Sequence, residues 1–156
     1  IFVTIGMHSI GFDRLVKKMD EISLRIKEKI IIQIGNTNYI PKNTTYFRFK
    51  SYSEIQRLCR NARVIVAHGG TGSVITAFEQ KTPIIVIPRL KDYGEVIDSQ
   101  QIDFVNALAE EGRVIPVYDL NELENTLKNK EFSLSEQKND RMLTNALQNY
   151  IVRLSE

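Results

Sequence analysis

Several common kinds of protein site and segment are missing from this sequence. Its 156 residues include one cysteine, Cys59, and no tryptophan. A single cysteine excludes an internal disulfide and a cysteine-based zinc site, and it fits a reducing cytoplasm. No run of about 18 apolar residues is present, which argues against a membrane-spanning helix. We therefore expect a cytoplasmic domain without a membrane-spanning helix of its own.

The charged and catalytic side chains also exclude some functions. The 21 basic and 19 acidic residues nearly cancel, so the net charge of +2 does not predict a nucleic-acid partner. The two histidines, His8 and His68, have no patterned carboxylate beside them, and we expect neither a metal site nor a cofactor. The sequence contains no P-loop lysine, no GxGxxG fingerprint and no serine nucleophile elbow.

The sequence does have regular alternation of apolar runs with helical periodicity. A hydrophobic content of 42% is ordinary for a globular domain. The pattern predicts one α/β domain over residues 1–156, ending in a long helix from about residue 135. Strands are predicted at residues 1–5, 30–34, 45–49, 64–67, 84–87 and 114–117, and helices at 12–26, 53–60, 71–80, 99–111, 120–127 and 135–154.

Most of these strands are apolar on both faces, which predicts a Rossmann-like, mainly parallel sheet with helices on both sides. In such sheets ligands bind at the carboxyl ends of the strands, beside a topological switch point. The loops after Ile5, Ile34, Ala67 and Ile87 all follow strands. We therefore expect these loops to meet along one edge of the sheet and to form a single site there.

The glycine-rich turn His68-Gly69-Gly70-Thr71-Gly72-Ser73 is the most informative stretch. In one interpretation the glycines only permit a tight turn, and Thr71 or Ser73 caps the next helix. In the other, backbone N–H groups and the two hydroxyls hold phosphate oxygens at the helix N-terminus.

Three further features leave two interpretations open. His8 and His68 each follow a strand closely, so they either face one cleft or bond only to loop backbone. The polar loop from Arg89 to Gln101 is either solvated or functional, and there Arg89 is a candidate for neutralising a diphosphate and Gln101 for contacting sugar hydroxyls. The apolar face of the last helix, residues 143–154, either packs on the core or binds a partner.

The order of these motifs resembles a known family. The matching stretches, in chain order, are Phe2-Val3-Thr4-Ile5-Gly6, Phe12-Asp13-Arg14-Leu15-Val16, Ile32-Gln33-Ile34-Gly35, His68-Gly69-Gly70-Thr71-Gly72-Ser73, Val86-Ile87-Pro88-Arg89, and Gly94-Glu95 with Gln101. Together they resemble the C-terminal, donor-binding domain of glycosyltransferase family 28 over roughly residues 1–118. Within the family, the sequence most resembles the small subunits of split bacterial exopolysaccharide and capsule glycosyltransferases. These subunits are similar to the soluble subunit of the eukaryotic enzyme that adds the second N-acetylglucosamine to dolichol-linked diphosphate.

This resemblance implies half of a GT-B enzyme. The half would bind a UDP-sugar, and a membrane-associated partner subunit would bind the lipid-diphosphate-linked acceptor. The reaction would invert the anomeric centre without a bound metal, by direct displacement. The sugar would be of the hexose type.

The resemblance also implies site residues. The first loop and the glycine-rich turn would flank the diphosphate, and the region after the second strand would approach the uracil, which assigns nucleotide binding to Gly6, Met7, His8, Gly35, His68, Gly69, Gly70, Thr71, Gly72 and Ser73. The candidates for ribose and donor sugar are Thr76, Glu79, Arg89, Glu95 and Gln101. His8 is the candidate general base, with a base from the partner as the alternative.

The sequence departs from the family at two positions. Many members carry a glutamate for the ribose hydroxyls where Thr76 stands, and Glu79 lies one helical turn further on. The capsule branch commonly has Asn-Asp-His-Gln where this chain has Asp98-Ser99-Gln100-Gln101. Two other functions therefore stay open, a stand-alone nucleotide-sugar enzyme and a non-catalytic nucleotide-binding module.

Overall fold

The predicted parallel sheet is confirmed. A computed structural model describes residues 1–95 and 100–129, apart from the side chains of residues 100 and 101. Within these ranges six strands pair in parallel in the order β3-β2-β1-β4-β5-β6. The strands are β1 (Phe2–Thr4), β2 (Ile31–Gln33), β3 (Thr45–Phe47), β4 (Ile65–Ala67), β5 (Ile84–Val86) and β6 (Ile115–Pro116).

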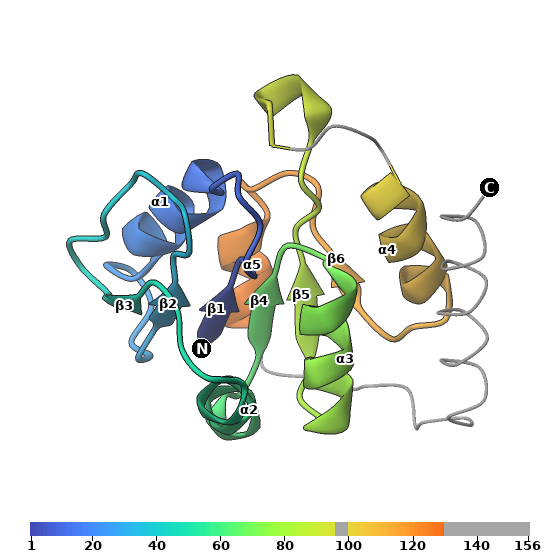
Figure 1. Cartoon of the computed structure of the whole chain (residues 1–156), viewed down its shortest axis with the longest axis horizontal. Coiled ribbons are helices and arrows are strands. Elements are labelled where there is room, and N and C mark those ends of the chain that lie inside the picture. Colours follow the sequence, from blue (N-terminus) through green and yellow to red (C-terminus); the bar gives the residue numbers. More distant parts are fainter. Residues whose placement is uncertain (96–99, 130–156) are drawn as a thin grey trace.

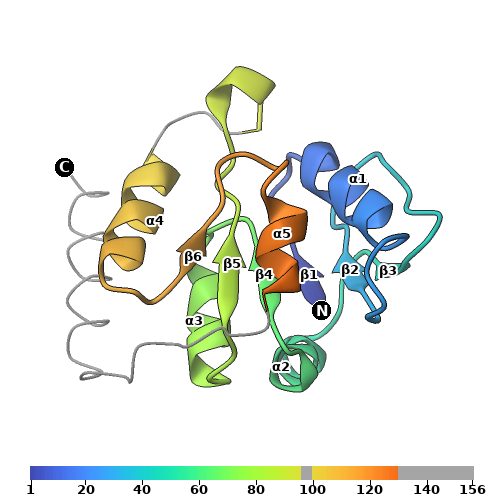
Figure 2. The same cartoon turned by 180° about the vertical axis from the view of Figure 1, so that it is seen from behind.

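Helices cover both faces of the sheet, as the apolar strands predicted. Figure 1 shows α2 (Tyr52–Asn61) and α3 (Thr71–Glu79) in front of the sheet, with α4 (Gln100–Glu110) to the right of α3. Figure 2, turned by 180°, shows α1 (Asp13–Ile22) and α5 (Leu123–Lys128) in front of the opposite face. The helix predicted from residue 135 lies outside the described residues, and no described helix is long and apolar enough to cross a membrane.

The alternation of side chains along each strand builds two separate cores. Val3, Val66 and Ile85 point to the α1/α5 face, where they pack with Leu15 and Leu123. Phe2, Ile65, Ile84 and Val86 point to the α2/α3/α4 face. This period of two places Thr4 and Gln33, the last residues of β1 and β2, in line with the α2/α3 face.

A local sequence signal explains where α2 begins. Ser51 caps α2 and forms a capping box with Glu54, so this helix begins at Tyr52, one residue before the predicted start. The polar loop after β5 contains a 3-10 turn, Lys91–Tyr93, that ends at Gly94 with a left-handed φ of 66°. The helix predicted at 120–127 begins later, at Leu123.

The loop after β2 is anchored to α1 by one buried carboxylate. Asp20 accepts hydrogen bonds from the backbone N–H groups of Lys42 and Asn43 and from the hydroxyls of Tyr39 and Thr44, at 2.9–3.1 Å. Burial alone would raise the pKa of Asp20, but these donors outweigh it, and the pKa lies below its usual range. The carboxylate is therefore charged at neutral pH and holds residues 39–44 on the domain.

Removing this carboxylate should loosen the loop. We expect Asp20→Ala to lower the free energy of unfolding by about 3 kcal/mol, because five donors, the side-chain amide of Asn43 included, lose their buried acceptor. Urea denaturation at pH 7 measures this change. Glu21→Ala, at the exposed neighbouring position of α1, is the matched control, and an equal effect of the two substitutions would contradict the anchoring role.

Candidate functional site: a pocket at the switch point of the sheet

The strand order creates a switch point between β1 and β4. From β1 the chain continues to β2 on one side, whereas β4 begins the other half of the sheet. The loops that leave β1 and β4 therefore diverge, and ligand sites in open α/β sheets lie at such points. A pocket of about 480 Å³ opens here, at the carboxyl ends of the strands.

Four chain segments line this pocket. The ends of β1 and β2 with the loop after β1 supply one side, one face of α2 with the preceding lysine supplies the second, and the start of α3 with its preceding turn supplies the third. The lining residues are Thr4, Gly6, Met7, Gln33, Lys50, Tyr52, Ile55, Cys59, His68, Gly70, Gly72, Ser73 and Thr76. No carboxylate is among these described lining residues, so the lining is a poor site for a cation. Lys50, the charged side chain in the lining, is paired with Glu54 at 2.7 Å.

The imidazole of His68 fills the space between the two diverging loops. A Cβ atom built on Gly6 would lie 2.7 Å from His68 Cε1, and one built on Gly70 would lie 2.3 Å from His68 Nε2. Gly6 also has a left-handed φ of 70°. Both positions therefore require glycine, because the ring packs directly against their backbone.

His68 is held in its neutral form. The side chain is buried, and burial lowers its pKa to about 4, helped by the nearby positive charge of Arg89 and opposed by a hydrogen bond to the backbone of Thr4. Its Nδ1 atom is buried without a hydrogen-bond partner among the described residues. A pKa this low makes His68 a poor general base at neutral pH, but its ring lies where a ligand in the pocket would meet it.

The N-terminus of α3 faces the pocket without a side-chain cap. Gly70 is the N-cap residue and no side chain accepts a capping hydrogen bond from the first turn, so the predicted alternative of a cap by Thr71 or Ser73 is wrong. A Cβ atom on Gly72 would meet nothing within 4 Å. The N-terminal end of this helix dipole therefore borders open space in the pocket, an arrangement that favours negative charge.

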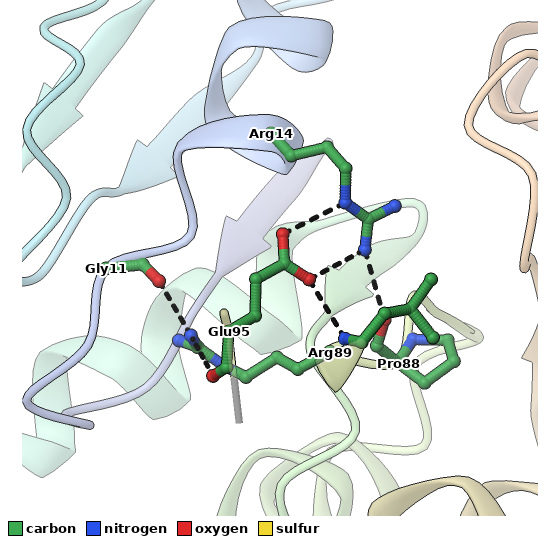
Figure 3. Close-up of polar contacts among 6 residues, drawn as sticks. Gly11, Arg14, Pro88, Arg89 and Glu95 are labelled. Atoms are coloured by element: carbon green, nitrogen blue, oxygen red, sulfur yellow. Dashed lines mark hydrogen bonds and ion pairs between the residues drawn. The ribbon is translucent and has the colours of Figure 1, made fainter. Parts of the chain in front are cut away.

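Arg89 and Glu95 occupy the neighbouring loop rather than the pocket lining. Figure 3 shows the bidentate pair in which Arg14 Nε and Nη2 donate to the two Glu95 carboxylate oxygens, each at 2.9 Å. The guanidinium of Arg89 donates to the carbonyls of Gly11 and Ile5 at 2.7 and 3.3 Å and stacks on the ring of Phe12. These contacts fix the loop after β5 to the start of α1, so the two side chains have structural partners where the sequence suggested a ligand.

His8 lies in the loop after β1 and Gly35 in the loop after β2, and neither lines the pocket. Ile10 N donates to His8 Nδ1 at 3.1 Å, which places the proton of neutral His8 on Nε2. This geometry does not support a base role, because neither ring nitrogen then has an open lone pair. Gly35, with a φ of 47°, approaches the carbonyl of Gly6 and so supports the loop after β1 from behind.

The remaining predicted residues divide between α3 and α4. Thr76 lines the pocket, but its hydroxyl donates to Gly72 O at 2.9 Å within the helix. Glu79 is exposed and accepts a hydrogen bond from the hydroxyl of Tyr52 at 2.9 Å. Gly69 and Thr71 belong to the turn but not to the lining. Gln101 is the second residue of α4, and its side chain lies outside the described residues.

Sequence reasoning missed the α2 side of the pocket and its floor. Thr4, Gln33, Lys50, Tyr52, Ile55 and Cys59 all line the pocket but were not among the predicted site residues. Gln33 carried a signal, since it is a polar residue inside an apolar strand. The α2 residues carried none, because their contribution depends on where α2 packs against α3.

The comparisons with known proteins agree with this architecture. The profile of the glycosyltransferase family 28 C-terminal domain matches residues 1–154. No curated protein matches significantly. Among solved structures, MurG of Acinetobacter baumannii aligns with a TM-score of 0.58 and 18% identity, covering 83% of this chain and 42% of MurG. The glycosyltransferase VinC in complex with dTDP aligns at 0.57 and 13%, covering 96% and 35%. A solution structure of ALG13 aligns at 0.58 and 17%, covering 86% of both chains.

These neighbours define the fold as the Rossmann-like half of GT-B glycosyltransferases. The chain belongs to glycosyltransferase family 28 and constitutes its C-terminal domain. It spans about two fifths or less of the length of MurG and VinC, and most of the length of ALG13.

The buried state of His68 predicts a pH effect on stability. Its folded pKa of about 4 lies below the unfolded value of 6.5, so the unfolded chain binds the proton more readily. The free energy of unfolding therefore has its full value with respect to His68 above pH 6.5. It decreases as the pH falls toward 4, by at most about 3 kcal/mol. Urea denaturation of His68→Asn should show a flatter pH dependence than the parent between pH 6.5 and 4.5. The exposed His8→Asn serves as control, and equal slopes for all three proteins would contradict the assignment.

The pair of Arg14 and Glu95 predicts a coupled loss of stability. Both side chains are largely buried, so Glu95→Gln should cost about 1–3 kcal/mol by leaving the guanidinium incompletely paired. Combined with Arg14→Met it should cost less than the sum of the single substitutions, measured by denaturant unfolding. The surface variant Lys128→Met, which breaks an exposed pair with Glu124, should leave the unfolding midpoint unchanged. Additivity of the two buried substitutions would refute the coupling.

Proposed function

We propose that this domain is the donor-binding subunit of an inverting two-chain glycosyltransferase, and that the pocket holds the UDP part of a UDP-sugar. The observation that carries the proposal is the pocket at the switch point, where the uncapped N-terminus of α3 and the open Cβ position of Gly72 face a lining without carboxylates. Membership of glycosyltransferase family 28 supports the reaction class.

The pocket suggests how the two parts of the nucleotide lie. The diphosphate fits beside Gly70, Gly72 and Ser73, where backbone N–H groups and the helix dipole meet negative charge. The nucleoside then extends along α2, whose Tyr52 and Ile55 offer an aromatic and an apolar wall. This arrangement moves the expected uracil contact from the region of Gly35 to the start of α2.

The same features explain how the domain would accelerate the transfer. In a direct displacement the acceptor oxygen forms a bond to the anomeric carbon while the bond to the β-phosphate oxygen breaks. Negative charge then grows on the diphosphate, and the donors at α3 bind it more strongly in the transition state than in the ground state. We propose that these protein groups meet that charge without a resident cofactor or metal.

The acceptor side of the reaction is assigned to a second chain. His68 has a pKa of about 4 and His8 has its Nδ1 engaged by the backbone, so neither suits the deprotonation of an acceptor hydroxyl at neutral pH. The chain also spans only a minor part of MurG and VinC. We assign the general base and the lipid-diphosphate acceptor, of the kind used in exopolysaccharide and capsule synthesis, to a membrane-associated partner subunit. The domain would then act at the cytoplasmic face of the membrane.

One observation favours a second candidate, a non-catalytic nucleotide-binding module. The hydroxyl of Thr76, where many family members carry a ribose-binding glutamate, is turned back onto Gly72 O. Calorimetric titration with UDP alone, and activity assays with and without the protein of the neighbouring gene, separate the two. UDP binding without activity in either assay would favour the module, and absence of UDP binding would refute both.

Two glycine substitutions in the same turn test the phosphate position. Gly72→Ala adds a methyl group in open space and improves helix propensity, so the melting temperature should stay equal or rise while UDP affinity falls at least tenfold. Gly70→Ala is the comparison, because its methyl group meets the His68 ring at 2.3 Å and should lower both stability and affinity. Unchanged UDP affinity of a folded Gly72→Ala protein would contradict the assignment.

A further inference from the structure

Two polar side chains end the rows of apolar residues at the floor of the pocket. Thr4 and Gln33 are register partners at the ends of β1 and β2, and both are 4% exposed and line the pocket. The other residues of these two strands, Phe2, Val3 and 31–32, are apolar. Burying two polar groups costs free energy unless each finds a partner.

Thr4 and Gln33 satisfy one another and the backbone of Gly6. The hydroxyl of Thr4 donates to Gln33 Oε1 at 2.6 Å and accepts from Gly6 N at 3.3 Å. Gln33 Nε2 donates to Gly6 O at 3.4 Å. The three residues form a closed hydrogen-bonded ring, and both polar backbone groups of Gly6 belong to it.

The directions in this ring are fixed by chemistry. A hydroxyl has one hydrogen, and Thr4 uses it for Gln33, so it meets Gly6 N as an acceptor. A carboxamide accepts at its oxygen and donates at its nitrogen, so Gln33 joins Thr4 to the Gly6 carbonyl in one orientation only. The N–H of Gly6 is thereby directed to Thr4 and does not serve as a phosphate ligand.

We propose that Thr4 and Gln33 are positioning residues for the anion-binding side of the pocket, an inference that rests on the proposed nucleotide function. Gly6 has a left-handed φ of 70° and lies against the imidazole of His68, which also packs against Gly70. The hydrogen-bonded ring of Thr4, Gln33 and Gly6 therefore sets the position of the loop after β1 relative to the N-terminus of α3. Through Gly6 and His68, the side chains of Thr4 and Gln33 determine how much space is left for a phosphate between the loop after β1 and α3.

The first test measures the ring without any ligand. In Thr4→Val and Gln33→Met, which keep the side-chain size, the Gly6 amide should exchange its hydrogen at least fivefold faster than in the parent, followed by NMR. Thr4→Ser keeps the hydroxyl and should therefore leave the exchange of the Gly6 amide as slow as in the parent. Thr45→Val makes the same chemical change at an exposed position of β3 and should not alter Gly6. Unchanged exchange in both ring variants would overturn the proposal whatever the ligand.

The second test separates positioning from a general loss of structure. UDP affinity should fall about tenfold in Thr4→Val and in Gln33→Met, whereas the weak binding of uridine, followed by NMR titration, should change less than twofold. The double variant should bind UDP no more weakly than the single variant with the lower affinity, because the same hydrogen-bonded ring is broken in each case. Equal losses for UDP and uridine, or additive losses in the double variant, would refute the positioning role.

The parent protein distinguishes this inference from the proposed function. If the parent does not bind UDP, the nucleotide function fails while the exchange result still decides whether the ring exists. If the parent binds UDP and the folded ring variants bind it equally well, the nucleotide function stands and the positioning role fails.

Discussion

The packing of one imidazole ring between two glycines is the constraint on which the site depends. His68 ends the buried run of β4, and its ring lies against the backbone of Gly6 after β1 and of Gly70 before α3. The same imidazole therefore limits how closely each of the two diverging loops can approach the other. A larger residue at either glycine would need the ring to move, and the ring is buried.

Burial of the ring also determines its chemistry. Removal from water and the nearby charge of Arg89 keep His68 neutral, so it can support the loops without adding a charge that changes with pH. Arg89 in turn is tied to the carbonyls of Gly11 and Ile5, and Glu95 is paired with Arg14. Buried charges in this region thus have protein partners, and the pocket presents neutral donors and the helix N-terminus. That division suits a ligand whose own charge grows during reaction.

The sequence predicted the sheet, its parallel direction and the edge where the loops meet, because apolar runs and glycine turns report burial and backbone direction directly. The glycine turn was found for the same reason, and its residues Gly70, Gly72 and Ser73 do line the pocket. Arg89 and Glu95 show the limit of this reasoning. A charged residue after a strand indicates an available charge, but only the packed structure shows that the charge is already neutralised by loops distant in sequence. Tyr52 and Ile55 were invisible for a related reason, since the position of α2 against α3 is a tertiary property.

Gln33 shows which polar residues deserve weight when such a sequence is read. A polar side chain on the solvated side of a helix is ordinary, whereas one inside a central parallel strand must find a partner or cost free energy. Its partner is Thr4, the register neighbour on β1, and together they hold the peptide of Gly6. The polar pair therefore marks where the packed α2/α3 face ends and the pocket begins. Because Gly6, two residues after Thr4, is also the glycine that His68 packs against, the hydrogen bonds of the pair and the buried imidazole act on the same residue. In the proposed function, recognition of an anion by α3 would depend on these two contacts with Gly6, one polar and one steric.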